Sequence, residues 1–166
     1  MASKDSSFDV VSQVDMQEVD NAYQQASKEL TQRYDLKDSH ATIDLSKADR
    51  TVTVVAPSEF VASQVVDVFT TRLVRRKVDL SSIKWADAAP ASGGNVRVVG
   101  TIVEGIEQDL AKKISKDVRD TKIKVKVTVE GDKLKVSSPS KDALQEVIAF
   151  LRDQDYGQPL QFINYR

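Results

Sequence analysis

Residues 122–136 read KIKVKVTVEGDKLKV, and this stretch decides the fold of the C-terminal half. Aliphatic residues alternate with lysine or threonine up to position 129, which is the period of a β-strand with one buried face. Gly131-Asp132 suits a two-residue turn, and a second alternating run follows it. The stretch therefore predicts a hairpin in which Val129 pairs with Leu134 and Val127 with Val136.

The same alternation gathers five lysines on the side of the hairpin that faces away from the core. They are Lys122, Lys124, Lys126, Lys133 and Lys135. Ammonium groups this close together can bind phosphates by charge, and any affinity for nucleic acid would then fall steeply with salt. The alternative is that the lysines only protect an edge strand from pairing with another sheet.

Apolar stripes at helical spacing flank the hairpin and recur in the N-terminal half. They predict helices over residues 16–34, 59–77, 106–118 and 141–151. Strands are predicted at 8–12, 41–45, 51–54, 81–85, 95–103, 122–130, 133–137 and 160–165. The order βαββαβ thus occurs twice, which predicts an α+β protein of two ferredoxin-like domains. Each would have a four-stranded antiparallel sheet with two helices on one face.

The domain boundary is expected where small residues accumulate. Residues 1–88 form the first predicted half, 89–94 a linker with the composition Ala-Pro-Ala-Ser-Gly-Gly, and 95–166 the second half. The first half holds 11 Lys and Arg against 14 Asp and Glu, and the second holds 13 against 11. The second half is therefore the one expected to attract anions.

Several functional classes are disfavoured by missing residues. The chain has no cysteine, a single histidine at position 40, and neither a phosphate-loop nor a dinucleotide-binding glycine motif. We expect no enzymatic activity, no cofactor and no metal. The chain also lacks an apolar segment of signal-peptide or membrane-span length, including at residues 1–5, so a cytoplasmic protein without membrane contact is expected.

Arg72 and Arg76 are a second candidate for phosphate binding, because their spacing places two guanidinium groups on one side of a helix. The alternative is that these cations complement the negative end of the helix dipole. The aromatic residues that RNA-recognition-motif domains use for base stacking are absent from the central strands, which carry Thr53, Lys133 and Lys135. Base-specific reading of RNA is therefore not expected.

Both ends of the chain resemble the YajQ family of nucleotide-binding proteins. The similar stretches are SFDVVSQVDMQEVDNA at residues 7–22 and GQPLQFINYR at residues 157–166, with KIKV at 122–125 between them. The resemblance implies a bacterial cytoplasmic protein in which strand 8–12 pairs in the second sheet and strand 95–103 in the first. It also implies a nucleotide ligand, with cyclic di-GMP and tRNA both proposed for the family. Residues 138–145, SPSKDALQ, depart from the family pattern by lacking an arginine and an acid.

The sequence thus predicts a non-enzymatic nucleotide-binding protein, with cyclic di-GMP or another purine nucleotide as ligand. The five lysines and the two arginines would meet the phosphates, and Phe8, Phe162 or Tyr165 would lie nearby. Two alternatives stay open. One is a weak, sequence-tolerant RNA or tRNA binder that uses the same face, and the other is a module that binds a protein partner at a sheet edge or in an interdomain cleft.

Overall fold

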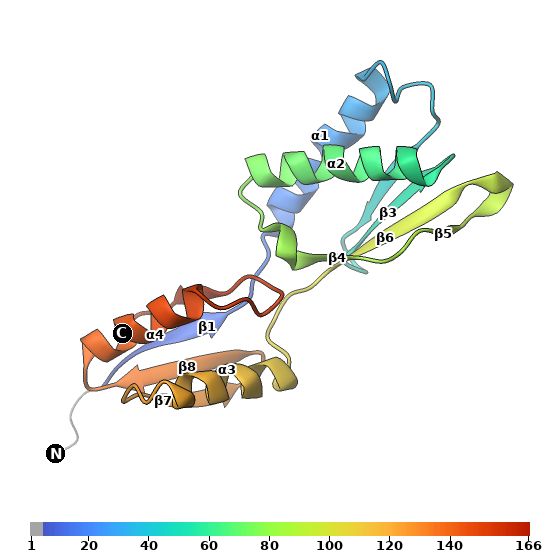
Figure 1. Ribbon diagram of the computed structural model, residues 1–166. Helices are drawn as coiled ribbons and strands as arrows, with labels where there is room; N and C mark the ends of the chain where they lie inside the picture. The colour runs from blue at the N-terminus through green and yellow to red at the C-terminus, as the bar shows by residue number, and fades with distance from the viewer. Residues whose placement is uncertain (1–4) are drawn as a thin grey trace. The chain divides into compact units, whose positions relative to one another are not determined.

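The computed structural model describes residues 5–166, and within them the chain folds into two compact units. Unit 1 combines the N-terminal residues up to Gln13 with Glu104–Arg166, and unit 2 is Val14–Val103. All strand pairs of the described residues are antiparallel. Each unit therefore has the α+β composition that the repeated sequence pattern predicts (Figure 1).

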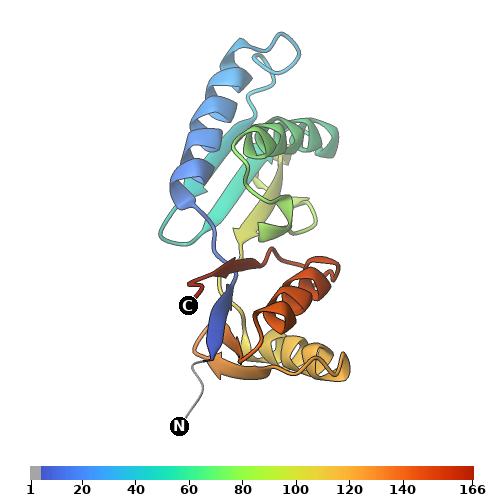
Figure 2. The ribbon, with the colours of Figure 1, turned by 90° about the vertical axis from the view of Figure 1, so that its left-hand side faces the viewer.

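Unit 1 is built on a sheet with strand order β7-β8-β1-β9. Its strands are β1 (Ser6–Val11), β7 (Lys126–Glu130), β8 (Lys133–Ser138) and β9 (Gln161–Ile163). Helices α3 (Gln108–Asp120) and α4 (Lys141–Arg152) pack their apolar sides on one face of it (Figure 2). The buried core between sheet and helices includes Phe8, Val10, Leu134, Val136, Ile114 and Val147.

Unit 2 has the strand order β2-β3-β6-β4, with β5 paired to β6 as an extra strand. The strands are β2 (Thr42–Ser46), β3 (Thr51–Ala56), β4 (Ile83–Trp85), β5 (Ala89–Pro90) and β6 (Val96–Ile102). Helices α1 (Met16–Gln32) and α2 (Glu59–Arg75) cover the sheet, and short 3₁₀ turns η1 (Leu80–Ser82) and η2 (Ser92–Gly94) complete the unit. Its core includes Val52, Val54, Val65, Phe69 and Leu73.

Helix starts lie where the capping residues predict them. The Asp15 carboxylate accepts hydrogen bonds from the backbone N–H groups of Gln17 and Glu18, and the Ser58 and Ser140 hydroxyls accept from the N–H groups of Val61 and Ala143. These bonds satisfy amide groups that have no partner within the helix. The short side chains of aspartate and serine therefore fix where three of the helices begin.

The hairpin of residues 126–138 has the predicted register, since Val129 pairs with Leu134 and Val127 with Val136. Its first strand is shorter than predicted, because regular pairing begins only at Lys126. Lys122 adopts a left-handed backbone conformation with φ of 63°, and the Val125 N–H donates to the Ile123 carbonyl. This turn interrupts the strand, although Ile123 and Val125 still pack on the core.

The segment 89–94, for which the sequence predicts a linker, contains β5 and η2 in the structure. Ala89 pairs with Arg97 and Pro90 with Val96, so the segment folds back on β6 as part of unit 2. Proline is tolerated here because a strand at the margin of a sheet need not donate on both sides. The four residues 1–4, which the expectation about signal peptides includes, lie outside the described part of the chain.

We predict that Phe69→Ala lowers the free energy of unfolding of unit 2 by about 3 to 5 kcal/mol, because a fully buried ring is lost from the core. Phe60→Ala on the same helix is the matched control, since the Phe60 side chain is 72% exposed. Denaturant unfolding followed by fluorescence of Trp85, the single tryptophan, measures both. Equal losses in the two variants would contradict the assignment of the buried side of α2.

Candidate binding site

The sheet of unit 1 has one face toward α3 and α4 and a second face that we call the polar face. Alternation sends Phe8 and Val10 of β1 into the core and leaves Ser7 and Asp9 on the other side. The polar face includes Ser7, Asp9, Lys126, Thr128, Glu130, Lys133, Lys135 and Ser137, as the register of β7, β8 and β1 shows. Three of the five predicted lysines therefore lie on strands of this face.

Asp9 lies at the centre of the polar face, and its side chain is 11% exposed. It accepts a hydrogen bond of 2.7 Å from the Asn164 amide and lies 3.3 Å from the Lys133 ammonium group. Burial by itself raises the pKa of Asp9, but the hydrogen bonds from Asn164 and Lys133 and the charges of Lys133 and Arg166 outweigh it. The net pKa is below the ordinary value of 3.8, so the carboxylate is charged at neutral pH.

The positive charge of Lys133 is consequently balanced by a carboxylate of the same face. Lys135 lies opposite Asp9 on one side and Thr128 on the other, and Lys126 lies opposite Ser137. Neither Lys126 nor Lys135 forms an ion pair with any residue that the structure describes. Lys122 and Lys124 precede the strand in the irregular turn. The predicted array of five cations is thus reduced on this face to two lysines without a carboxylate.

An extra residue in the C-terminal segment determines how Tyr165 and Arg166 point. Asp9 pairs with Ile163, so an uninterrupted register would place Tyr165 opposite Ser7. Instead, Ser7 and Arg166 exchange two backbone hydrogen bonds of 3.1 and 2.9 Å, so the C-terminal segment contains one extra residue. Asn164 accommodates this bulge with a φ of 56°. Asparagine tolerates this left-handed conformation better than most residues. Such a bulge re-aims the side chains beyond it.

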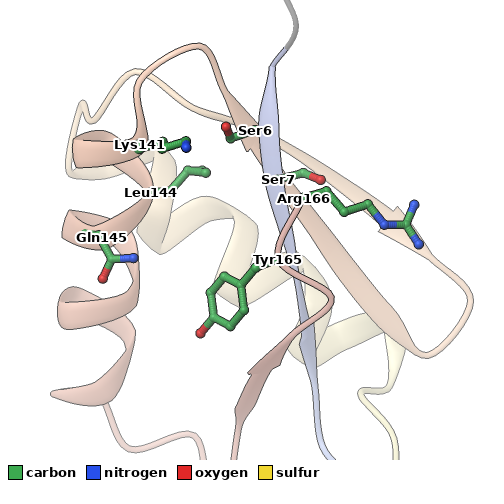
Figure 3. Close-up of a pocket in the computed structure, with 7 residues that line it drawn as sticks. All are labelled: Ser6, Ser7, Lys141, Leu144, Gln145, Tyr165 and Arg166. Carbon is green, nitrogen blue, oxygen red and sulfur yellow. The ribbon is translucent and has the colours of Figure 1, made fainter.

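The bulge places Tyr165 at a pocket of about 330 Å³ at the end of the sheet. In Figure 3 the Tyr165 ring lies on the side of α4, whereas the Arg166 side chain extends across β1 in the opposite direction. Lys141 and Gln145 approach from the first turns of α4. The complete lining is Ser6, Ser7, Lys141, Leu144, Gln145, Tyr165 and Arg166.

The chemistry of the pocket combines an aromatic ring with cations. Tyr165 is 58% exposed, so its ring is available for stacking. Lys141 is the first residue of α4, where the helix dipole is already positive, and a cation there is not explained by helix stability. Anions bind readily at such a helix end. The pocket can therefore hold a ligand with a flat apolar part and a negative group.

The predicted aromatic residues differ in their access to a ligand. Phe8 is 0% exposed and belongs to the core, so its ring cannot stack on a nucleotide. Phe162 is partly buried, packs edge-on against Phe8 with ring centres 5.8 Å apart, and has the Arg152 guanidinium 5.7 Å from its own centre. Of the three candidates, Tyr165 alone lines the pocket.

Arg72 and Arg76 lie in unit 2 and contact carboxylates of α1. The Arg72 guanidinium donates to the Glu29 Oε1 atom at 2.6 and 3.2 Å, and the Arg76 Nη1 atom is 3.6 Å from the Glu18 Oε2 atom. These pairs join the two helices of the unit. Both arginines therefore stabilise the contact between α1 and α2, and their role as a phosphate clamp stays a prediction.

The sequence did not single out Ser6, Ser7, Lys141, Leu144, Gln145 or Arg166 as site residues, although they line the pocket. They come from three segments that are distant in the chain and meet only through the pairing of β1 with β8 and β9. One local signal was available, namely a lysine directly after the helix cap at Ser140.

The family model described as "Nucleotide-binding protein YajQ-like" matches residues 6–166. The chain belongs to the YajQ-like family. Its similarity to members of that family extends over nearly the whole of each chain. A nucleotide-binding protein of Desulfitobacterium hafniense is 46% identical over 164 residues, which cover 99% of each chain. One from Synechococcus elongatus is 47% identical over 161 residues, covering 97% of this chain and 98% of its own length.

A further YajQ-like relative, from Chloroherpeton thalassium, is 43% identical over 160 residues, or 96% of this chain and 97% of its own. All three relatives come from bacteria and bear the name "nucleotide-binding protein", which describes binding and not a reaction. The resemblance seen at the two ends of the sequence is thereby confirmed as membership of the family. Among residues 5–166, no helix has the length and apolar character needed to cross a membrane.

We predict that Asp9→Asn flattens the acid dependence of folding stability. The pKa of Asp9 is lower in the folded state than in the unfolded state. The charged carboxylate therefore stabilises the fold at pH values above the unfolded pKa, and this stabilisation is lost as the pH falls through the folded pKa. Thermal unfolding between about pH 2 and 7 measures the effect. Asp87→Asn, at an exposed loop position, serves as the matched control and should retain the wild-type profile. Parallel profiles for wild type and Asp9→Asn would contradict the assignment.

Proposed function

We propose that this chain binds a purine nucleotide in the pocket lined by Tyr165, Lys141 and Arg166. The single observation that carries the proposal is the meeting of an exposed aromatic ring with two cations that form no ion pair among the described residues. Aromatic rings stack on bases regardless of sequence, and lysine and arginine are the usual partners of phosphate. Membership of a family named for nucleotide binding supports the same ligand class.

The two sides of the pocket would bind different parts of the nucleotide. On the side of α4, the Tyr165 ring would cover the base, and the Gln145 amide would reach a polar edge of it. Lys141 and the N-terminal end of α4 would attract a phosphate. Arg166, which extends across β1, would hold a second phosphate together with Lys135 of the polar face. Lys133 would act indirectly, by keeping the Asp9 carboxylate from competing for those cations.

One phosphate position on each side of β1 suits a ligand with more than one phosphate. Cyclic di-GMP, which the resemblance to the family implies, has two phosphates and two guanine bases and is the first candidate to test. A purine mononucleotide with a chain of phosphates is the other form of the same proposal. No enzymatic step is proposed, because the pocket contains no histidine or carboxylate that could act as a general base.

We further infer that the two ferredoxin-like domains have exchanged their first strands. The N-terminal strand β1 pairs with β8 and β9, and β6 pairs with β3 and β4, which supports this interpretation. The domains would then be Val14–Val103 and the remainder of the chain. In this arrangement Ser7 of β1 reaches the pocket formed by α4 and the C-terminal segment. The site would therefore require the exchange of strands. We also expect the protein to act in the cytoplasm.

We predict that Arg166→Glu weakens binding of the preferred nucleotide by at least about tenfold, because one phosphate contact is replaced by repulsion. Arg75→Glu makes the same charge change at an exposed position of unit 2 and should bind as the wild type does. Isothermal titration calorimetry with cyclic di-GMP, GTP, ATP and a short single-stranded RNA compares the ligands.

A heat signal for RNA alone, with affinity that falls steeply with salt, would replace the nucleotide proposal by the RNA alternative. Absence of heat with every member of the panel would reject both. Equal weakening in Arg166→Glu and Arg75→Glu would show that overall charge, and not this pocket, governs binding. Tyr165→Ala should also weaken binding, whereas Tyr34→Ala, at another highly exposed tyrosine, should not.

A further inference from the structure

Strand β7 is the last strand on its side of the unit 1 sheet. Glu130 and Lys133 flank the two-residue turn and are opposite each other, which makes them a hydrogen-bonded pair in a hairpin of this kind. Alternation along the ladder then points the backbone N–H and C=O groups of Val127 and Val129 away from β8. These groups are a template for one more antiparallel strand.

The side chains of β7 are complementary to a second copy of the same strand. An antiparallel pair centred on Thr128 places Lys126 of each copy opposite Glu130 of the partner subunit. Neither Lys126 nor Glu130 is engaged in an ion pair by the residues that the structure describes. Opposite charges that face each other across antiparallel strands stabilise the pair, whereas like charges destabilise it.

The charges also select one register among the possible ones. A pair centred on Val127 would face Lys126 with Thr128 of the partner subunit, and one centred on Val129 would face Glu130 with Thr128 of the partner subunit. Only the register centred on Thr128 joins both charged residues of the strand with opposite charges. In the same register, Val129, which is 44% exposed, comes to lie opposite Val127 of the partner subunit. Apolar and charged contacts therefore favour the same alignment.

We propose that two copies of this chain associate through β7 in an antiparallel pair centred on Thr128. The two four-stranded sheets then form one continuous sheet of eight strands about a twofold axis. Lysines on an edge strand usually prevent such pairing. Here the single lysine of β7, Lys126, lies opposite Glu130 of the partner subunit, so its charge favours the pair. The proposal does not depend on the pocket or its ligand, because neither Lys126 nor Glu130 lines it.

A charge-swap series tests the proposal on the full chain by sedimentation velocity across a range of concentrations. Lys126→Glu places two carboxylates opposite each other at both ends of the pair of strands. Glu130→Lys places two ammonium groups opposite each other at the same positions. Each should weaken dimerisation by about tenfold or more. The double variant Lys126→Glu with Glu130→Lys restores opposite charges and should regain the wild-type dimer. Lys112→Glu, an equal charge change at an exposed position of α3, is the control and should leave the dimer unchanged.

A cysteine cross-link tests the same register directly and remains informative if a charge variant fails to fold. The chain has no cysteine of its own, so Thr128→Cys introduces a single thiol. In the proposed pair the two Thr128 positions face each other at a Cα separation of about 4.5 Å, which a disulfide can bridge. Mild oxidation should give a covalent dimer of the Thr128→Cys variant. The control is Thr42→Cys, at an exposed position of the edge strand β2, which should give little covalent dimer.

The results have opposite consequences for the proposal. A wild-type chain that sediments as a monomer up to millimolar concentration would overturn it. Equal cross-linking of Thr128→Cys and Thr42→Cys would also overturn it, because chance collision would then explain the product. Recovery of the dimer in the double charge variant, together with a selective cross-link at position 128, would support the pairing of β7 in this register.

Discussion

The alternation of side chains along β1 and β8 is the constraint on which unit 1 depends. Because successive residues of a strand point to opposite faces, burying Phe8 and Val10 under the helices forces Ser7 and Asp9 to the other side. Leu134 and Val136 impose the same separation on β8. A slip of one residue would exchange the two sets and bury lysines in the core. The hydrophobic effect thus fixes the register, and the register fixes where the charges lie.

The candidate site follows from this register and from one departure from it. The pairing of β1 with β8 brings Lys135 beside Asp9, and the buried Asp9 carboxylate accepts hydrogen bonds from Lys133 and Asn164. The extra residue at Asn164 then turns Tyr165 toward α4 and Arg166 away from it. A regular strand could not present a ring and a guanidinium on these two sides while keeping both hydrogen bonds between Ser7 and residue 166. Local irregularity, in this account, is what makes the pocket.

Much of the fold could be predicted from the sequence, since it is specified by local patterns. The turn Gly131-Asp132 set the hairpin register correctly, and capping residues such as Ser58 and Ser140 marked the starts of helices. Strand β7 was predicted too long, because alternation continues through Ile123 and Val125 while the backbone turns at Lys122. The pairing of Pro90 with Val96 was missed because composition alone resembles a linker.

The site was less predictable, because it is assembled by contacts between distant segments. Alternation identified the lysines but could not reveal that Asp9 neutralises Lys133 or that Glu29 holds Arg72. Nor could it show that Phe8 is wholly buried. The pocket residues Lys141 and Arg166 have no pattern in common, and only the position of a lysine at the positive end of α4 hinted at an anion there.

Mapping of backbone amide shifts during titration of the full chain with cyclic di-GMP, and then with GTP, is the most direct test of nucleotide binding in the pocket of unit 1. We predict that the largest changes cluster at Ser6, Ser7, Lys141, Gln145, Tyr165 and Arg166, with smaller changes at Lys135. The amides around Arg72 and Arg76 should remain unperturbed. Saturable changes confined to those arginines, with none at the pocket of unit 1, would show that the nucleotide binds elsewhere.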